Sequence, residues 1–211
     1  MILGLTTAGS YCAVALLAQG RVVAAKHESL AKGQSERLFP MTAEVLEEGG
    51  VRYQDLDAIG VSAGPGNFTG IRISIAAARG LALGLGIPSV AVSTLEALAL
   101  DHSGPLLASI TAGRGHYFCQ RFGKAARGPA LVPVDAVAQW HLPGLRCIGD
   151  DADALAATLG ATSLTAPPNP ALAIARIAAD RWQDDPPRPA PLYLRPADAA
   201  PARDAPPPVL P

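Results

Sequence analysis

The chain has 211 residues, with 17 Lys and Arg against 18 Asp and Glu, and a formal net charge of −1. This balance is a poor match to a protein that grips nucleic acid by itself, because phosphate binding needs a concentrated positive field. Hydrophobic residues make up 49% of the chain and charged residues 17%, which excludes disorder of the whole chain. Aromatic residues are only 5%, so small apolar side chains dominate and few rings remain to stack on bases.

We expect no segment to cross a membrane, because a span needs about 20 apolar residues. The most apolar run, residues 80–92, is interrupted by three Gly and by Pro88. No basic stretch precedes the apolar run at the N-terminus, so a signal peptide is not expected. The three cysteines, Cys12, Cys119 and Cys147, are far apart in the sequence, which favours free buried thiols in a reducing cytoplasm over disulfides.

The first hundred residues predict three strands and then alternating helices and strands. Short apolar runs at 2–5, 12–18 and 22–28 are separated by Gly-containing turns, as in an antiparallel meander. From residue 35 the apolar spacing becomes helical, and this helix ends at Gly49-Gly50. A strand at 58–63, a helix at 71–84, a strand at 89–92 and a helix at 95–100 follow. This order implies a mixed sheet with helices on its faces.

The pattern restarts less regularly after residue 101, and we place a domain boundary near residue 102. Strands are predicted at 106–111, 117–122, 131–132 and 146–149, and helices at 153–159 and 171–182. From Pro186 the chain is dense in Pro and Ala, with one structured-looking piece at 191–195. The predicted organisation is an N-terminal half at 1–101, a C-terminal half at 102–195 and a Pro/Ala-rich flexible tail at 196–211.

The strongest local motif is Gly64-Pro65-Gly66-Asn67-Phe68-Thr69-Gly70-Ile71-Arg72, between a predicted strand and a predicted helix. Asn67 or Thr69 could cap the helix, and the N–H groups at its start would suit an anion. The motif lacks both the GxxxxGK[ST] of a P-loop and the GxGxxG of a dinucleotide site. Two interpretations stay open: a nucleotide or partner contact, and a tight connection packed against a neighbour.

A row of small residues marks the helix predicted at 71–84. Ala76, Gly80 and Gly84 recur every four residues, which would let a second helix approach closely. The row either forms a helix interface with a partner or packs inside the protein.

The histidines do not form the spacing of a metal site. None lies four residues from another or beside a cysteine, so a His-x-x-x-His zinc site is absent. The four are His27, His102, His116 and His141. We therefore predict no bound metal.

Residues 64–72 are similar to the motif G-P-G-S-F-T-G-L-R of the TsaB (YeaZ) family, which serves threonylcarbamoyladenosine synthesis on bacterial tRNA. Residues 2–7, 37–40 and 57–61 support the resemblance, and 191–195 resembles the family's closing P-x-Y-L-R. The resemblance implies an α/β actin-like ATPase (ribonuclease H-like) fold, in two related halves with mixed sheets, the second half reduced. It also implies a non-catalytic scaffold subunit that binds and organises TsaD. The complex adds threonylcarbamoyl to N6 of adenosine 37 in tRNAs that read codons beginning with A.

The resemblance further implies the partners and surroundings of the chain. These are a TsaD-type catalytic subunit, a TsaE-type ATPase, a homodimer when the chain is alone, tRNA only through the complex, the cytoplasm and no membrane. No cofactor is required, and ATP or ADP at a subunit interface stays open. The TsaD relative binds its metal through a His-x-x-x-His pair, which this chain lacks.

Two departures from the family pattern concern acids of actin-like ATPases. Thr6 stands where the first strand usually has an acid, and Thr111 replaces the acid of D-A-R-x-G-x-x-Y. A neutral hydroxyl cannot hold Mg²⁺ as a carboxylate does, so we predict no catalytic residue and no ATP hydrolysis by the chain alone. The alternatives are a stand-alone actin-like ATPase or small-molecule kinase, which the missing acids disfavour, and a peptidase, which no zinc pair supports.

Overall fold

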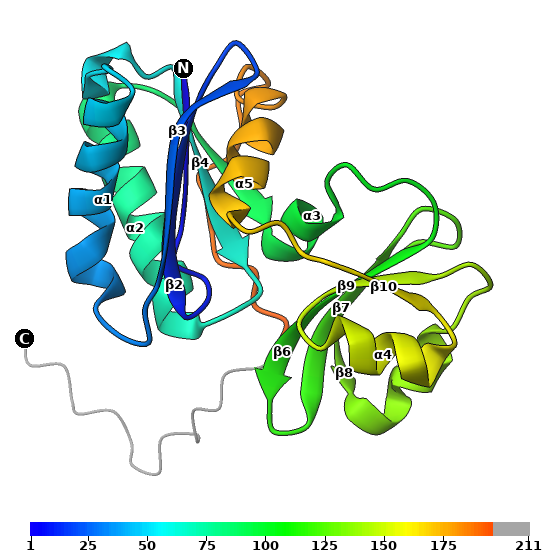
Figure 1. The fold of residues 1–211 in the computed structure, drawn as a ribbon. Helices are drawn as coiled ribbons and strands as arrows, with labels where there is room; N and C mark the ends of the chain where they lie inside the picture. The colour runs from blue at the N-terminus through cyan, green and yellow to red at the C-terminus, as the bar shows by residue number, and fades with distance from the viewer. Residues whose placement is uncertain (196–211) are drawn as a thin grey trace, which may run out of the picture.

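Two five-stranded mixed sheets lie side by side in the computed structural model, which describes residues 1–195 (Figure 1). The first sheet has the order β3-β2-β1-β4-β5 and the second β10-β9-β6-β7-β8. The first contains β1 (Ile2–Thr6), β2 (Tyr11–Ala18), β3 (Arg21–Ser29), β4 (Ala58–Gly64) and β5 (Ser89–Ser93). The second contains β6 (Leu106–Gly113), β7 (His116–Phe122), β8 (Arg127–Pro133), β9 (Arg146–Gly149) and β10 (Thr162–Leu164). The tail predicted at 196–211 lies outside the described residues.

The two sheets repeat one pattern of pairing. In each, three consecutive strands form an antiparallel meander, and the first of them also pairs in parallel with the fourth strand, which pairs in parallel with the fifth. β6 is therefore the counterpart of β1, and β9 the counterpart of β4. This duplication confirms the predicted actin-like fold with two related α/β halves.

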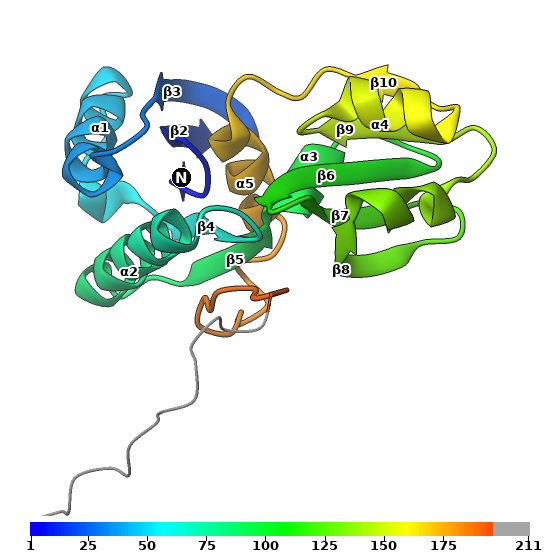
Figure 2. The same ribbon diagram turned by 90° about the horizontal axis from the view of Figure 1, so that it is seen from below.

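Helices cover both faces of the first sheet. α1 (Gln34–Glu48) and α2 (Phe68–Leu85) lie side by side on one face, and α5 (Pro170–Ala179) lies on the other (Figure 2). Alternation along β1 explains this arrangement, because Leu3 and Leu5 join the core under α1 and α2. Gly4, on the opposite face, lets α5 approach, since a Cβ there would lie 2.3 Å from the carbonyl oxygen of Ala171. β1 is consequently buried on both faces.

The second half is reduced in its helices, as predicted. η2 (Val134–Trp140), a 3₁₀ helix, occupies the place of α1 in the chain order. α4 (Ala152–Leu159) has 8 residues where α2 has 18. Trp140, Leu145 and Leu155 form the core that these two elements share with the sheet. α3 (Thr94–Ala99) lies between the halves, with Leu95 buried against Leu106 and Ile148.

The helix predicted at 171–182 belongs, in space, with the first half. It ends at Ala179, and Ile174 and Ile177 pack with Ile2 and Val90 of the first sheet. By its place in the chain, this helix was predicted to belong to the C-terminal half. The sequence could not show otherwise, because an apolar helix face is compatible with either sheet. The division at residue 102 otherwise stays a prediction.

α2 begins at Phe68, three residues before the predicted start. The Asn67 side-chain oxygen accepts a hydrogen bond from the Gly70 N–H at 2.8 Å and caps the helix, so Phe68–Gly70 form its first turn. By length and composition α2 could also cross a membrane. Its buried residues, among them Ile71 and Ile75, pack instead on the first sheet.

Candidate functional site

The Gly-rich loop joins β4 to α2 and packs on the turn that follows β1. Gly64 has φ 95° and Gly66 φ 154°, in the region that favours glycine. A Cβ on Gly66 would lie 2.3 Å from the carbonyl oxygen of Ala8, and one on Gly70 would lie 1.8 Å from that of Thr7. The motif therefore needs glycine because two backbone segments touch there.

Hydrogen bonds join the same two segments. The Asn67 N–H donates to the Ala8 carbonyl at 2.6 Å, and the Thr7 hydroxyl donates to the Gly70 carbonyl at 2.7 Å. Because the N–H groups of Asn67 and Gly70 have partners within the protein, they do not form a phosphate cradle. These contacts support the second interpretation of the Gly-rich motif, as a tight connection packed against a neighbouring segment. A nucleotide or partner contact at this loop stays a prediction.

The N-terminal part of α2 presents Phe68, Thr69 and Arg72 to solvent, while Pro65 of the loop is buried. The Arg72 guanidinium lies over the Phe68 ring, 3.9 Å from its centroid. Its Nε–H donates to the Tyr193 hydroxyl at 2.8 Å, although Tyr193 is 121 residues further along the chain. The sequence predicted a structured piece at 191–195, but it did not predict that Tyr193 contacts the Gly-rich motif.

The predicted small-residue row faces an open groove between α1 and α2. The groove has a volume of about 670 Å³, and Ala76, Gly80 and Gly84 form part of its lining. No atom of a neighbouring element lies within 4 Å of a Cβ built on Gly80 or Gly84, so the row is not packed inside the protein. The remaining lining is mostly apolar and includes Leu38, Phe39, Tyr53 and Leu81.

Large apolar side chains stand exposed on the two helices that form this groove. Leu83 on α2 is 81% exposed and Phe39 on α1 is 47% exposed. Contiguous apolar surface of this kind marks interaction sites in soluble proteins. The structure thus brings the predicted helix row and the 35–48 helix together on one open face.

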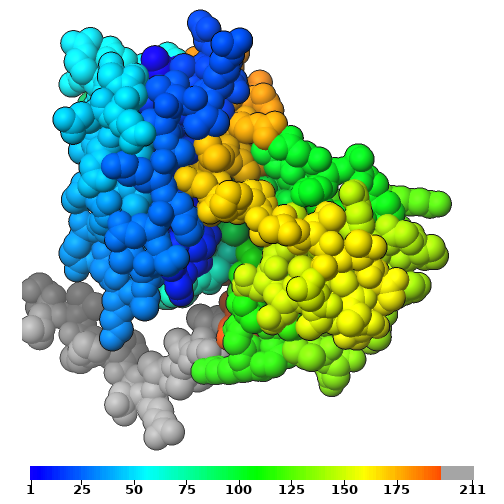
Figure 3. All heavy atoms as spheres, viewed as in Figure 1, coloured from blue at the N-terminus to red at the C-terminus, as the bar shows by residue number. Residues whose placement is uncertain are grey.

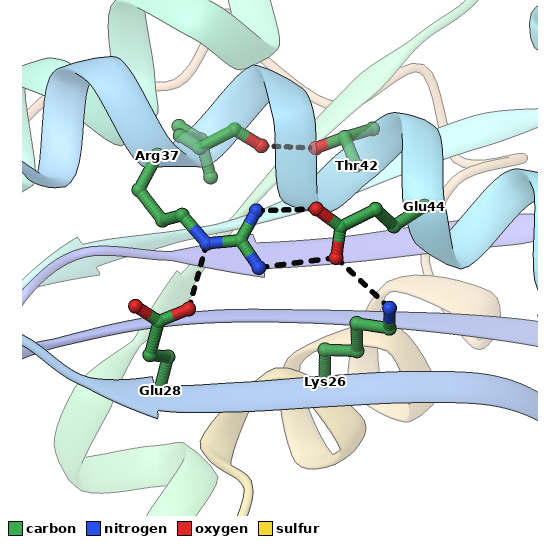
Figure 4. Close-up of polar contacts among 6 residues, drawn as sticks. Lys26, Glu28, Arg37, Thr42 and Glu44 are labelled. Atoms are coloured by element: carbon green, nitrogen blue, oxygen red, sulfur yellow. Dashed lines mark hydrogen bonds and ion pairs between the residues drawn. The ribbon is translucent and has the colours of Figure 1, made fainter.

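An ion-pair network fixes α1, one wall of the groove, against β3 (Figure 4). The Arg37 guanidinium donates to Glu44 at 2.6 and 3.0 Å and to Glu28 at 2.6 Å, and Lys26 donates to Glu44 at 2.9 Å. Arg37, and then Lys26, lower the pKa of Glu44 to about 2. Since Lys26 and Glu28 belong to β3, the network sets the position of the groove relative to the sheet.

Ser62 stands in Gly60-Val61-Ser62-Ala63-Gly64, which matches the G-x-S-x-G pattern of a nucleophile elbow. No catalytic serine was predicted, and the structure explains this match without one. Ser62 lies within β4 with no exposed surface, and its hydroxyl is hydrogen-bonded to that of Thr94 at 2.8 Å. An elbow serine must be exposed above the sheet, so this residue is structural.

The two halves meet along a hollowed junction, crossed by the gold segment that leads into α5 (Figure 3). The cavity there has a volume of about 230 Å³, with Tyr11, Leu98, Ile110 and Asp150 in its lining. Burial raises the pKa of Tyr11 to about 12, so the phenol stays neutral.

The residues present do not fit a magnesium nucleotide. Thr6 is fully buried and accepts a hydrogen bond from the Ala8 N–H at 3.2 Å. The N–H and hydroxyl of Thr111 donate to the Asp150 carboxylate at 2.8 and 2.5 Å. Asp150, the carboxylate in the cavity lining, is therefore already hydrogen-bonded to Thr111. The lining contains no Lys or Arg to oppose phosphate charge, and its volume is below the roughly 300–1,000 Å³ of ligand pockets. Within residues 1–195 no cluster of three His, Cys, Asp or Glu could hold a metal.

Comparison with known proteins agrees with this architecture. The family model described as TsaD, tRNA N6-adenosine threonylcarbamoyltransferase, matches residues 24–179. YeaZ from Pseudomonas aeruginosa has a similar structure, with a TM-score of 0.74 and 27% identity over 92% of this chain and 99% of that chain. The tRNA threonylcarbamoyladenosine biosynthesis protein TsaB of Escherichia coli is 35% identical over 132 residues. The chain belongs to the TsaB (YeaZ) family.

The match to E. coli TsaB covers 60% of this chain and 57% of that protein. An uncharacterized protein of Mycobacterium tuberculosis is 36% identical over 173 residues, 81% of this chain and 79% of that protein. The TsaB family takes part in tRNA threonylcarbamoyladenosine biosynthesis. The alternative of a stand-alone ATPase or small-molecule kinase is not favoured.

Proposed function

We propose that this chain is a non-catalytic subunit of a complex that adds threonylcarbamoyl to tRNA, and that it binds a TsaD-type catalytic subunit through the α1–α2 groove. The single observation that carries the proposal is the open row of Ala76, Gly80 and Gly84 inside an apolar groove of about 670 Å³. Small residues let a partner helix come close enough for dense packing, and the loss of apolar surface to water drives the association.

The chain acts without chemistry of its own in this proposal. Thr6 and Thr111 supply hydroxyls where actin-like ATPases use acids, and the lining of the cavity between the halves contains no Lys or Arg to hold phosphates. We propose that the chain requires no nucleotide. If ATP or ADP takes part, it binds at the interface with another subunit.

The remaining parts of the proposal rest on membership of the TsaB family. A TsaE-type ATPase joins the complex in the cytoplasm, and the chain reaches tRNA through the complex. When the chain is alone, two copies pair through the same groove, because a row of small residues can pack on an identical row.

Gly80→Leu tests the groove. We expect this variant to fold, since the new side chain enters open space and Gly is unfavourable in a helix by about 1 kcal/mol relative to good helix formers. Leu at this position holds a partner helix away, so binding to the organism's own TsaD-type subunit should fall at least tenfold in calorimetric titration. Self-association measured by sedimentation should fall in parallel.

Gly80→Ala is the matched control, because a methyl group keeps the row smooth. We expect it to bind the partner nearly as wild type does. A folded Gly80→Leu variant that binds the partner with unchanged affinity would overturn the groove as the interface.

A further inference from the structure

We propose that the exposed cluster of Phe68, Arg72 and Tyr193, extended by Arg195, binds single-stranded RNA in the assembled complex. We call these four residues the stacking cluster. The inference rests on the proposed function, and it adds a surface of this chain that faces the RNA substrate.

The stacking cluster joins segments that are far apart in the sequence. After α5 the chain returns to the end of β4, where the Leu192 N–H donates to the Ala63 carbonyl at 2.8 Å. This contact places Tyr193 beside the first turn of α2, where the centroid of its ring lies 5.5 Å from that of Phe68. The cluster is therefore held by backbone as well as side-chain contacts.

The geometry preorganises flat surfaces for stacking. The Arg72 guanidinium lies 3.9 Å from the Phe68 centroid and 5.7 Å from that of Tyr193, and its Nε–H is hydrogen-bonded to the Tyr193 hydroxyl. Phe68 is still 54% exposed and Tyr193 49% exposed. Exposed rings beside a fixed guanidinium are the surfaces on which unpaired bases stack.

The charges of the stacking cluster complement phosphate. Among residues 1–195, no carboxylate forms an ion pair with Arg72 or Arg195. Arg195 donates to the Gly113 carbonyl at 3.4 Å, which brings its guanidinium to the β6–β7 turn.

RNA suits these residues better than an acidic protein segment does. A carboxylate would use the arginines and leave both rings in water, whereas a nucleotide offers a base to the rings and a phosphate to the guanidinium groups. The net charge of −1 then explains why the surface works only in the complex, where other subunits supply most of the phosphate contacts.

The test uses the full chain assembled with its TsaD-type partner and a fluorescent single-stranded RNA with the sequence of an anticodon loop. Phe68→Ala should weaken RNA binding roughly 5- to 150-fold, the effect of losing one stacked base. Arg72→Gln should reduce the slope of log K against log salt by about 1, the effect of losing one phosphate contact. Both variants should unfold at the wild-type temperature and bind the partner normally.

Two matched controls separate this inference from the proposed function. Phe39→Ala removes an exposed ring from the α1–α2 groove, so it should weaken partner binding and leave RNA binding by the fully assembled complex unchanged. Arg21→Gln removes an exposed cation at the start of β3 and should change neither.

Wild-type RNA affinity in both Phe68→Ala and Arg72→Gln would overturn the inference. Loss of partner binding in these variants, with RNA binding by the fully assembled complex retained, would also overturn it and assign the stacking cluster to a protein interface. Equal displacement of the RNA by polyglutamate would show that charge acts without stacking, and would reject the proposed role of the rings.

Discussion

Gly70 and Gly80 lie on the same helix, and we predict that alanine has opposite effects on stability at the two positions. At Gly70 the new Cβ would lie 1.8 Å from the Thr7 carbonyl oxygen and 2.9 Å from its carbonyl carbon. Both atoms belong to the backbone, so no side-chain rotation relieves the overlap. At Gly80 the Cβ meets nothing within 4 Å.

The magnitude at Gly70 follows from what must move. Separating α2 from the turn after β1 weakens two hydrogen bonds, from the Thr7 hydroxyl to Gly70 and from the Asn67 N–H to Ala8. Each contributes roughly 0.5–1.5 kcal/mol, the overlap itself costs about 1–3 kcal/mol, and the helix gains about 1 kcal/mol from Ala. The net loss is about 3 kcal/mol, which lowers the melting temperature of a chain this long by about 6–12 °C.

Thermal unfolding followed by circular dichroism measures both variants. Gly80→Ala should melt about 2–4 °C above wild type, because only the gain in helix propensity acts there. A Gly70→Ala protein that melts at the wild-type temperature would refute the close contact between the Gly-rich loop and the turn after β1.

Two further predictions concern titration and thiol reactivity. Because Arg37 and Lys26 lower the pKa of Glu44 from 4.5 to about 2, its ion pairs stabilise the fold above pH 4.5 and lose this effect as the pH falls towards 2. Glu44→Gln should therefore melt below wild type at neutral pH, with a difference that disappears near pH 2; an equal difference at both pH values would contradict this. Burial raises the pKa of Cys12 and Cys147 to about 11 and that of Cys119 to about 12, so the folded protein should not react with Ellman's reagent until denaturant exposes the thiols. Rapid reaction of any thiol in the folded chain would contradict their burial.

Periodicity in the sequence was enough to predict the first half of the fold. The meander, the helix at 35–48 and the alternating units appear in the structure with small shifts of their ends. η2 and β10 were missed because they are short, and β10 is three partly exposed residues without an apolar alternation.

The position of α5 could not be predicted from local pattern, because an apolar helix face is compatible with either sheet. Gly4 and Gly60 are the residues that indicate where α5 packs, because both lack a side chain at the place where α5 contacts the first sheet. Their role becomes visible only when β1 and β4 are known to be adjacent strands.

The candidate site was predicted in its residues but not in its contacts. The sequence marked Ala76, Gly80 and Gly84, and the structure shows the open groove that they line. Phe68 and Arg72 were predicted as part of the Gly-rich motif. The hydrogen bond from Arg72 to Tyr193 joins residues 121 positions apart, and no local sequence pattern predicts such a contact. The glycines of the motif are explained by backbone contact with Thr7 and Ala8, which spacing alone does not reveal.

One reconstitution tests most directly whether this chain is a required subunit without chemistry of its own. The organism's TsaD-type and TsaE-type proteins, tRNA and the threonylcarbamoyl donor would be combined with and without the chain, and modified adenosine 37 would be measured by mass spectrometry. We expect modification only when the chain is present, full activity with a Thr6→Ala, Thr111→Ala double variant that is shown to be folded, and strongly reduced activity with Gly80→Leu at subunit concentrations near the wild-type Kd. Full modification without the chain would contradict the account, and so would loss of activity in the folded double variant while it still binds its partner.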